Sequence, residues 1–211
     1  MLPAATVVKK PAGLDDVTAA AIPLAGAAAA QCVEAVAPQS GQTVLVNGAD
    51  GGVGSFAVQL LAARGVTVLA TGTPGSADRL RELGASTVID WTAGSVVEQV
   101  RQSHPDGVDA LVNLAGFDAS QVPTGAVRTG GAVASTTALP DEQTLTAQGL
   151  TGQMIMARPL TDVVGPLAEQ AANGTLKVSV ASVVPLDQAA DALGTLAAGK
   201  ANGKIVVRVH S

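Results

Sequence analysis

A short glycine-rich segment between two apolar runs constrains this chain more than any other part of it. Residues 43–46 (Thr-Val-Leu-Val) are typical of a buried strand, and residues 55–64 carry apolar side chains as in a helix packed on a sheet. The turn between them reads Asn-Gly-Ala-Asp-Gly-Gly-Val-Gly. This order predicts a dinucleotide-binding unit, because bare backbone can approach a pyrophosphate and the helix N-terminus offers it free N–H groups. A tight turn without a ligand is the alternative.

The residues after this turn alternate between strand-like and helix-like segments. Apolar runs predict strands at 66–71, 87–89, 108–114, 131–134 and 149–156, and helices are predicted at 76–83, 95–102 and 119–128. Strands that alternate with helices of this length predict an α/β fold, a doubly wound parallel sheet with helices on both faces. This is the arrangement of the Rossmann nucleotide-binding fold.

The composition limits the possible partners. The 211 residues carry a net charge of −5, and the aromatic side chains are two Phe and one Trp. Without a basic cluster or stacking platforms, we expect no nucleic-acid partner. The alanine-rich stretch over 18–30 is interrupted by Pro23 and Gly26 and is too weakly apolar to span a membrane. The first ten residues do not resemble a signal peptide, so we expect a cytoplasmic protein.

Residue types for metal or nucleophilic chemistry are sparse. The single cysteine, Cys32, lies in an apolar stretch and is expected to be an inert buried thiol. His104 and His210 have no ligand partner at useful spacing, so we expect no metal site. The sequence contains no recognisable catalytic triad, and it identifies no general acid or base.

Two dehydrogenase families use a glycine turn of this kind. Gly48, Gly52 and Gly54 fit the Gly-x-x-x-Gly-x-Gly spacing of short-chain dehydrogenases, and residues 113–116 (Asn-Leu-Ala-Gly) resemble their fourth-strand motif. The general acid of that family is a tyrosine followed four residues later by a lysine. The chain contains no tyrosine, so that active site cannot be built here.

The sequence is more similar to the medium-chain dehydrogenase/reductase superfamily, in its zinc-independent quinone oxidoreductase (zeta-crystallin-like) branch. The glycine turn resembles that family's Ala-x-x-Gly-Gly-Val-Gly class, with one residue fewer between the alanine and the first glycine. Further resemblances lie at residues 10–13 with 19–26, 83–85 (Leu-Gly-Ala), 88–91 (Val-Ile-Asp-Trp), 107–109 (Gly-Val-Asp) and 203–209 (Gly-Lys-Ile-Val-Val-Arg-Val). The resemblance implies a metal-independent reductase that acts on a small-molecule quinone or α,β-unsaturated carbonyl.

The resemblance also implies which residues bind the cofactor. The glycine turn would hold the pyrophosphate, the end of the second strand would line the adenosine ribose pocket, and the ends of the fourth and fifth strands would lie along the nicotinamide half. Trp91 stands where relatives usually have a tyrosine, with a core-edge aromatic as its alternative role. Asn202 and Lys200 precede the last strand and would lie near the cofactor, or in a plain solvated loop. The expected site residues are Gly48, Gly51, Gly52, Val53, Gly54, Thr71, Gly72, Thr73, Ser76, Trp91, Asn113, Gly116, Thr136 and Asn202.

The end of the second predicted strand bears on the choice of cofactor. NAD sites usually have an acidic residue there, which accepts hydrogen bonds from the ribose hydroxyls. Residues 71–76 contain no acid, and Arg79 follows nearby. We therefore expect NADP(H) rather than NAD(H), although the basic residue that relatives usually carry on this loop is missing.

The sequence departs from the family pattern at its beginning. Relatives start with a GroES-like barrel, and this sequence starts at about the point where that barrel ends. We expect one nucleotide-binding unit over 1–211, with a Rossmann core at about 40–175 and a C-terminal segment, 176–211, that packs on the barrel in relatives. Apolar strands at 177–184 and 204–209 and a helix at 187–198 would then be left uncovered. We therefore expect a homodimer, or a partner chain that covers the exposed strands.

Two further departures concern the site itself. Residues 27–30 are four alanines where relatives carry a threonine and a bulky aromatic near the nicotinamide, which suggests a smoothed wall. Asp50 puts a carboxylate inside the phosphate loop, and we expect it to point to solvent.

Three functions stay open on the sequence alone. The first is an NADPH-dependent reductase of quinones or α,β-unsaturated carbonyls. The second is a nucleotide-binding protein or subunit without catalysis of its own, which the missing barrel and the alanine wall favour. The third is a structural relic that binds nothing.

Overall fold

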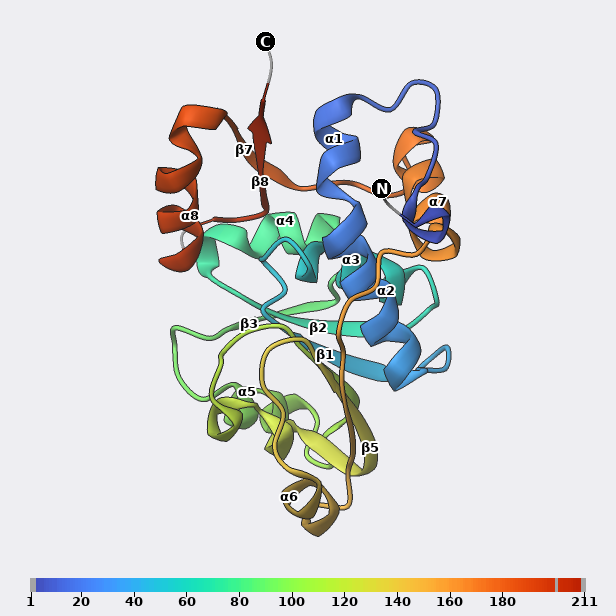
Figure 1. The fold of residues 1–211 in the computed structure, drawn as a ribbon. Helices are drawn as coiled ribbons and strands as arrows, with labels where there is room; N and C mark the ends of the chain where they lie inside the picture. The colour runs from blue at the N-terminus through green and yellow to red at the C-terminus, as the bar shows by residue number, and fades with distance from the viewer. Residues whose placement is uncertain (1–2, 200, 210–211) are drawn as a thin grey trace.

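The computed structural model describes residues 3–199 and 201–209, so Lys200 and His210 lie outside the described residues. Most of the chain forms a six-stranded parallel sheet with helices on both faces (Figure 1). The strands of this sheet are β1 (Thr43–Asn47), β2 (Thr67–Gly72), β3 (Thr87–Asp90), β4 (Val108–Asn113), β5 (Val127–Ser135) and β6 (Thr151–Met154). Their order is β3-β2-β1-β4-β5-β6, which confirms the doubly wound α/β fold.

Eight helices and five short 3₁₀ turns occupy the described residues. The α-helices are α1 (Asp16–Ala21), α2 (Pro23–Val36), α3 (Gly54–Ala62), α4 (Ala77–Glu82), α5 (Val96–Ser103), α6 (Glu142–Ala147), α7 (Thr161–Ala172) and α8 (Ala189–Ala197). The 3₁₀ turns are η1 (Ala4–Thr6), η2 (Pro74–Ser76), η3 (Ala119–Gln121), η4 (Thr124–Ala126) and η5 (Leu186–Gln188). None of the described helices is both long and apolar enough to cross a membrane.

Alternation of side chains along the central strand divides the core into two layers. Val44 and Val46 of β1 belong to the cluster under α2, α3 and α7, whereas Leu45 belongs to the cluster under α5 and α6. All three are fully buried. The uninterrupted apolar run that predicted this strand therefore reflects burial on both faces.

The predicted helix over 119–128 is wrong. The segment forms η3 and η4, and β5 already begins at Val127. Pro123 explains the break, because a residue before proline is pushed out of the helical region, and Val122 is extended at φ −69° and ψ 123°. The last predicted strand of the sheet, 149–156, is shortened to β6, and α6 before it was not predicted.

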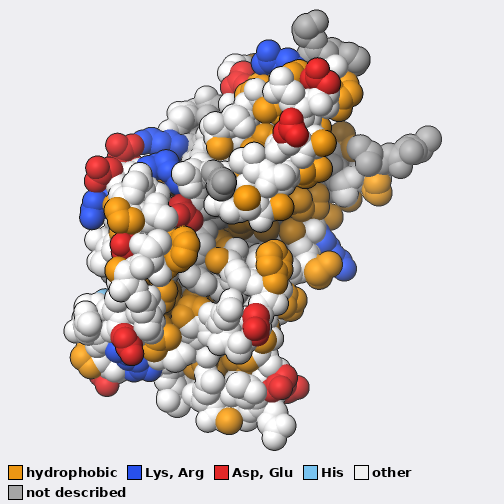
Figure 2. Space-filling model, turned by 90° about the vertical axis from the view of Figure 1, so that its left-hand side faces the viewer, with side chains coloured by type: hydrophobic (Ala, Val, Ile, Leu, Met, Phe, Trp, Pro, Cys, Tyr) orange, Lys and Arg blue, Asp and Glu red, His pale blue; other side chains and the backbone are white. Residues whose placement is uncertain are grey.

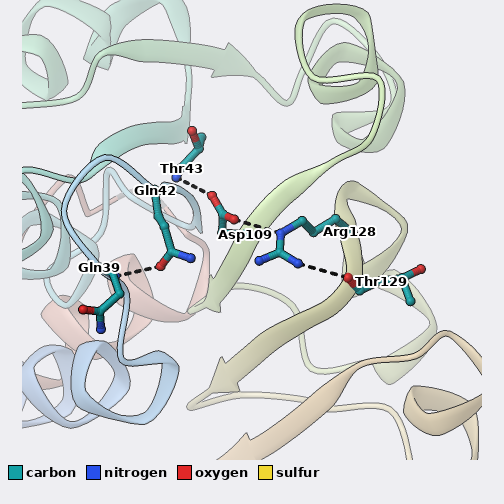
Figure 3. A network of polar contacts seen from close by, with 6 residues as sticks. All are labelled: Gln39, Gln42, Thr43, Asp109, Arg128 and Thr129. Carbon is teal, nitrogen blue, oxygen red and sulfur yellow. Dashed lines mark hydrogen bonds and ion pairs between the residues drawn. The ribbon is translucent and has the colours of Figure 1, made fainter.

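A network at the amino-terminal ends of the central strands fixes their relative position (Figure 3). The carboxylate of Asp109 on β4 accepts hydrogen bonds from the Thr43 backbone N–H on β1 (2.7 Å) and from Arg128 Nε on β5 (2.8 Å). Burial alone would raise the pKa of Asp109, but these hydrogen bonds and the Arg128 charge together lower it. One side chain thus joins three strands whose opposite ends form the candidate site.

The C-terminal segment forms a separate small sheet at the top of Figure 1. Strands β7 (Val180–Pro185) and β8 (Lys204–Arg208) pair in parallel, and α8 lies beside them. Much of this part stays uncovered, and Figure 2 shows hydrophobic side chains gathered on the upper part of the molecule. Among the described residues, the large exposed side chains here are Val183, Leu186, Leu193, Leu196, Val207 and Val209.

Candidate functional site

A cavity of about 390 Å³ lies at the carboxyl ends of the strands, where the strand order reverses between β1 and β4. Open α/β sheets bind ligands at such switch points. Polar side chains, glycines and one indole ring make up the wall. The described lining residues are Asn47, Gly48, Asp50, Thr71, Thr73, Trp91, Ala115, Gly116, Gln121, Gly199, Ala201 and Asn202.

The glycine turn leads from β1 directly into α3. Gly48 has φ +82°, and a Cβ there would lie 2.9 Å from the Ala115 Cβ. A Cβ on Gly54 would overlap the Gly48 carbonyl oxygen. Glycine is therefore required at position 48 by the positive φ angle and by the close approach of Ala115. At position 54 it is required by the close approach of the Gly48 carbonyl group.

The start of α3 and the turn before it contain backbone donors without a partner among the described residues, next to the cavity-lining residue Asp50. The N–H groups of Ser55 and Phe56 bond to the carbonyl oxygens of Gly51 and Val53. No hydrogen-bond acceptor among the described residues serves the N–H groups of Gly52, Val53 and Gly54. These donors at the positive end of the helix dipole fit a pyrophosphate group.

A row of hydrogen-bonded side chains crosses the carboxyl ends of four strands. Thr71 Oγ1 accepts from the Gly48 N–H (2.8 Å) and donates to Asn47 Oδ1 (3.1 Å). Asn47 Nδ2 donates to Asn113 Oδ1 (2.8 Å), and Asn113 Nδ2 donates to Ser135 Oγ (3.0 Å). Asn113 and Ser135 are fully buried and support the floor of the cleft, whereas Asn47 and Thr71 of the same row line its interior.

The loop after β2 is shaped by its own capping interactions. Thr73 N–H donates to Ser76 Oγ (3.0 Å), and Ser76 Oγ donates to the Thr73 carbonyl oxygen (3.0 Å). A Cβ on Gly72 would lie 2.6 Å from both Leu80 Cδ1 and Ser76 Oγ. Gly72 and Ser76 therefore position Thr73 in the wall without lining the cavity themselves.

The expectation that Asp50 points to solvent is wrong. Asp50 is half-buried and lines the cavity together with Thr71 and Thr73. Arg79 holds the Asp50 backbone, because Arg79 Nη2 donates to the Asp50 carbonyl oxygen (2.8 Å). Burial raises the pKa of the Asp50 carboxyl, while hydrogen bonding and the Arg79 charge offset part of that rise.

Residues distant in sequence close the remaining sides. Trp91, which follows β3, lines the cavity and is 54% exposed. Asn202, in the loop after α8, contributes to the opposite boundary. The stem of Lys204 lies over the glycine turn, since a Cβ on Gly52 would lie 2.6 Å from Lys204 Cδ. The C-terminal segment is thus part of the site.

Six of the expected site residues line one cavity, namely Gly48, Thr71, Thr73, Trp91, Gly116 and Asn202. The others lie in its supporting structure or the adjoining turn, namely Gly51, Gly52, Val53, Gly54, Gly72, Ser76, Asn113 and Thr136. The lining residues that were not among the expected site residues are Asn47, Asp50, Gln121, Gly199 and Ala201, while Ala115 lies between the expected Asn113 and Gly116. The position of Asn47 at the last residue of a buried strand could have indicated its role.

The alanine stretch over residues 27–30 does not line this cavity. Ala27, Ala28 and Ala29 are buried in the core where α2 packs on α3 and β5, and none of them lines the cavity. Cys32 on the same helix is fully buried, and burial raises the pKa of its thiol to about 12. The described residues contain no group of three or more His, Cys, Asp or Glu side chains placed to hold a metal.

The chain is similar in sequence to known oxidoreductases. The NAD(P)H oxidoreductase RTN4IP1, mitochondrial, of Mus musculus is 38% identical over 97 residues, 44% of this chain and 24% of the relative. The 2-methylene-furan-3-one reductase of Solanum lycopersicum is 30% identical over 207 residues, 95% of this chain and 49% of the relative. The chain thus spans between a quarter and a half of the length of these relatives.

Solved structures share the fold over nearly the whole chain. An NAD-dependent alcohol dehydrogenase superposes with a TM-score of 0.87 at 28% identity, covering 99% of this chain and 63% of that one. A mycobacterial protein complexed with NADPH superposes with a TM-score of 0.83 at 26% identity, covering 95% and 67%. The quinone oxidoreductase of Coxiella burnetii has a TM-score of 0.87 at 23% identity, covering 96% and 64%, which shows the fold alone.

A family match covers more than half of the chain. The family described as zinc-binding dehydrogenase matches residues 83–207, which include β3 to β8 and the C-terminal side of the cleft. The glycine turn and the strand order belong to the same nucleotide-binding architecture. The chain therefore belongs to the zinc-binding dehydrogenase family, within the medium-chain dehydrogenase/reductase superfamily of oxidoreductases.

Proposed function

We propose that this chain binds a nicotinamide dinucleotide in the cavity at the strand ends and uses it to reduce quinones or α,β-unsaturated carbonyls. The observation that carries the proposal is the glycine turn, whose free N–H groups at the start of α3 adjoin a cavity at the switch point. The tomato relative, which is named as a 2-methylene-furan-3-one reductase, supports this substrate class.

The chain's own residues would bind and orient the cofactor. The backbone of Gly51 to Gly54 would hold the pyrophosphate, and Thr73 and Trp91 would flank the adenosine ribose. The nicotinamide, when bound, supplies the hydride chemistry. Metal independence stays a prediction that rests on the family resemblance.

The proposal allows either NAD(H) or NADP(H), which differ in the 2′-phosphate on the adenosine ribose. The sequence favours NADP(H), because no acid ends β2. The neighbours include both an NAD-dependent enzyme and a complex with NADPH.

A second candidate is a nucleotide-binding subunit that needs a partner domain for turnover. The uncovered apolar side chains of β7, β8 and α8 favour it, because such surfaces usually meet another protein surface. We propose accordingly that the chain forms a homodimer or pairs with a chain that covers these strands. The cytoplasmic location also stays a prediction, since one relative is named mitochondrial.

Two measurements on the purified chain test these proposals. Titration with NADH and with NADPH, followed by nicotinamide fluorescence, is expected to show saturable binding of at least one of them. Oxidation of the bound dinucleotide by a panel of quinones and enones would then indicate a reductase, and binding without turnover would favour the subunit. Binding of neither dinucleotide would contradict both.

A further inference from the structure

The position of the adenosine ribose follows from the proposed function, on which this inference rests. A pyrophosphate on the N-terminus of α3 places the ribose at the end of β2 in this fold. The wall there consists of Asp50, Thr71, Thr73 and Trp91. These four residues therefore meet either the two ribose hydroxyls of NAD(H) or the 2′-phosphate of NADP(H).

Asp50 is the one charged side chain among the described residues that line the cavity. Arg79 is a neighbouring cation that donates to the Asp50 carbonyl oxygen, and its charge offsets part of the rise that burial causes in the pKa of the Asp50 carboxyl, but it does not line the cavity. The Arg79 Nη1 atom is buried and has no hydrogen-bond partner among the described residues. Among the described residues, the wall that faces the ribose therefore carries one negatively charged side chain and no positively charged one.

The chemistry of a half-buried carboxylate separates the two cofactors. An ionised carboxylate only accepts hydrogen bonds, so it can bind ribose hydroxyls, which donate them. A 2′-phosphate at neutral pH has mostly acceptor oxygens and carries negative charge, so it would be repelled by a carboxylate in a site that water screens weakly. We infer that Asp50, from within the glycine turn, takes the place of the missing acid at the end of β2 and selects NAD(H) against NADP(H).

The inference reverses the cofactor preference that the sequence suggested. That preference considered residues 71–76 alone, where no acid occurs. The fold brings a carboxylate to the same wall from the turn after β1, more than twenty positions earlier in the chain.

The test is a titration of the intact chain with NADH and NADPH, for the wild type and for Asp50→Asn. We expect the wild type to bind NADH at least tenfold more tightly, and the substitution to reduce this ratio at least tenfold, mainly through tighter NADPH binding. Asp50→Ser serves as a second variant if Asp50→Asn folds poorly. Asp78→Asn is the matched control, because Asp78 is an exposed acid at the start of α4 and does not line the cavity.

Several outcomes would overturn the inference. A wild type that prefers NADPH, with that preference lost in Arg79→Met, would show that Arg79 swings in to meet a 2′-phosphate. An unchanged NADH to NADPH ratio in Asp50→Asn would show that the carboxylate does not select. Binding of neither nucleotide by the wild type would overturn the proposed function and this inference with it. The two other results differ from this one, because in both of them the wild type binds a dinucleotide.

Discussion

At the scale of single residues, the cleft depends on side chains that hold its backbone in place. Thr71 is almost fully buried, and its hydroxyl bonds the first glycine of the turn. Asn47 and Asn113 continue this connection across the sheet. Hydrogen bonds to the ends of the strands thus fix the start of the turn.

Replacement of Thr71 by Val should weaken dinucleotide binding about tenfold. Valine keeps the shape but leaves the Gly48 N–H without its acceptor, and an unmet buried donor costs about 1–3 kcal/mol. Nicotinamide fluorescence measures the change. Thr67→Val, at the other end of β2, is the control and should bind like the wild type. Equal affinity of both variants would show that the turn does not need this hydrogen bond.

Replacement of Asp109 by Asn should destabilise the fold by about 2 kcal/mol near neutral pH, because two hydrogen bonds to a charged group are weakened. The folded-state pKa of Asp109 is lowered, so its stabilisation is present above the unfolded value of 3.8 and is lost as pH falls toward the folded value. Urea unfolding of both proteins should therefore show a difference that narrows below about pH 4. Asp106→Asn, an exposed neighbour, is the control. A difference that stays constant down to pH 3 would contradict this account.

At the scale of elements, the sequence predicts the strands that are buried in the core. It does not predict the segments whose conformation depends on local backbone geometry. The strands β1 to β4 are predictable because their apolar residues are buried between two helical layers. The segment over 119–128 has helical composition, but Pro123 stops the helix. The direction in which the Asp50 side chain points cannot be predicted from a periodic pattern, because Asp50 lies in an irregular turn. The sequence thus predicted the glycine turn, but it did not predict that the Asp50 side chain of this turn lines the cavity.

Helix packing on the upper layer requires a small residue at one point. A Cβ on Gly26 of α2 would lie 2.8 Å from Leu167 Cδ1 of α7, which is buried. Gly26→Ala should therefore destabilise the protein by about 1–2 kcal/mol in chemical unfolding, despite the better helix propensity of alanine. Gly194→Ala, in α8 with open space around it, should not destabilise the protein. Destabilisation by both variants to the same degree would mean that α2–α7 contact is not the cause.

At the scale of the whole molecule, the C-terminal segment has two roles. Its loop supplies Gly199, Ala201 and Asn202 to the cleft, while its two-stranded sheet and α8 leave large apolar side chains exposed, such as Leu193 at 66%. The resemblance to relatives predicted the strands and the helix of this segment. The parallel pairing of β7 with β8 in a separate sheet was seen only in the structure. Whether the chain functions without a partner therefore depends on which protein surface packs against these apolar side chains.

We expect the purified chain to associate through this surface. Light scattering should give a mass of about twice the 20.7 kDa of one chain, and Leu193→Gln should shift the equilibrium toward the monomer. Leu24→Gln, an exposed leucine on α2, is the control for a general effect of added polarity. A monomer at all concentrations would count against the homodimer and leave a partner chain as the covering surface.

The most direct test of the central claim is a crystal structure of the chain with a nicotinamide dinucleotide. We expect the pyrophosphate on the backbone of Gly51 to Gly54 and the adenosine ribose against Asp50 and Thr73. A dinucleotide bound elsewhere, or a cleft that stays empty at saturating concentration, would contradict the account.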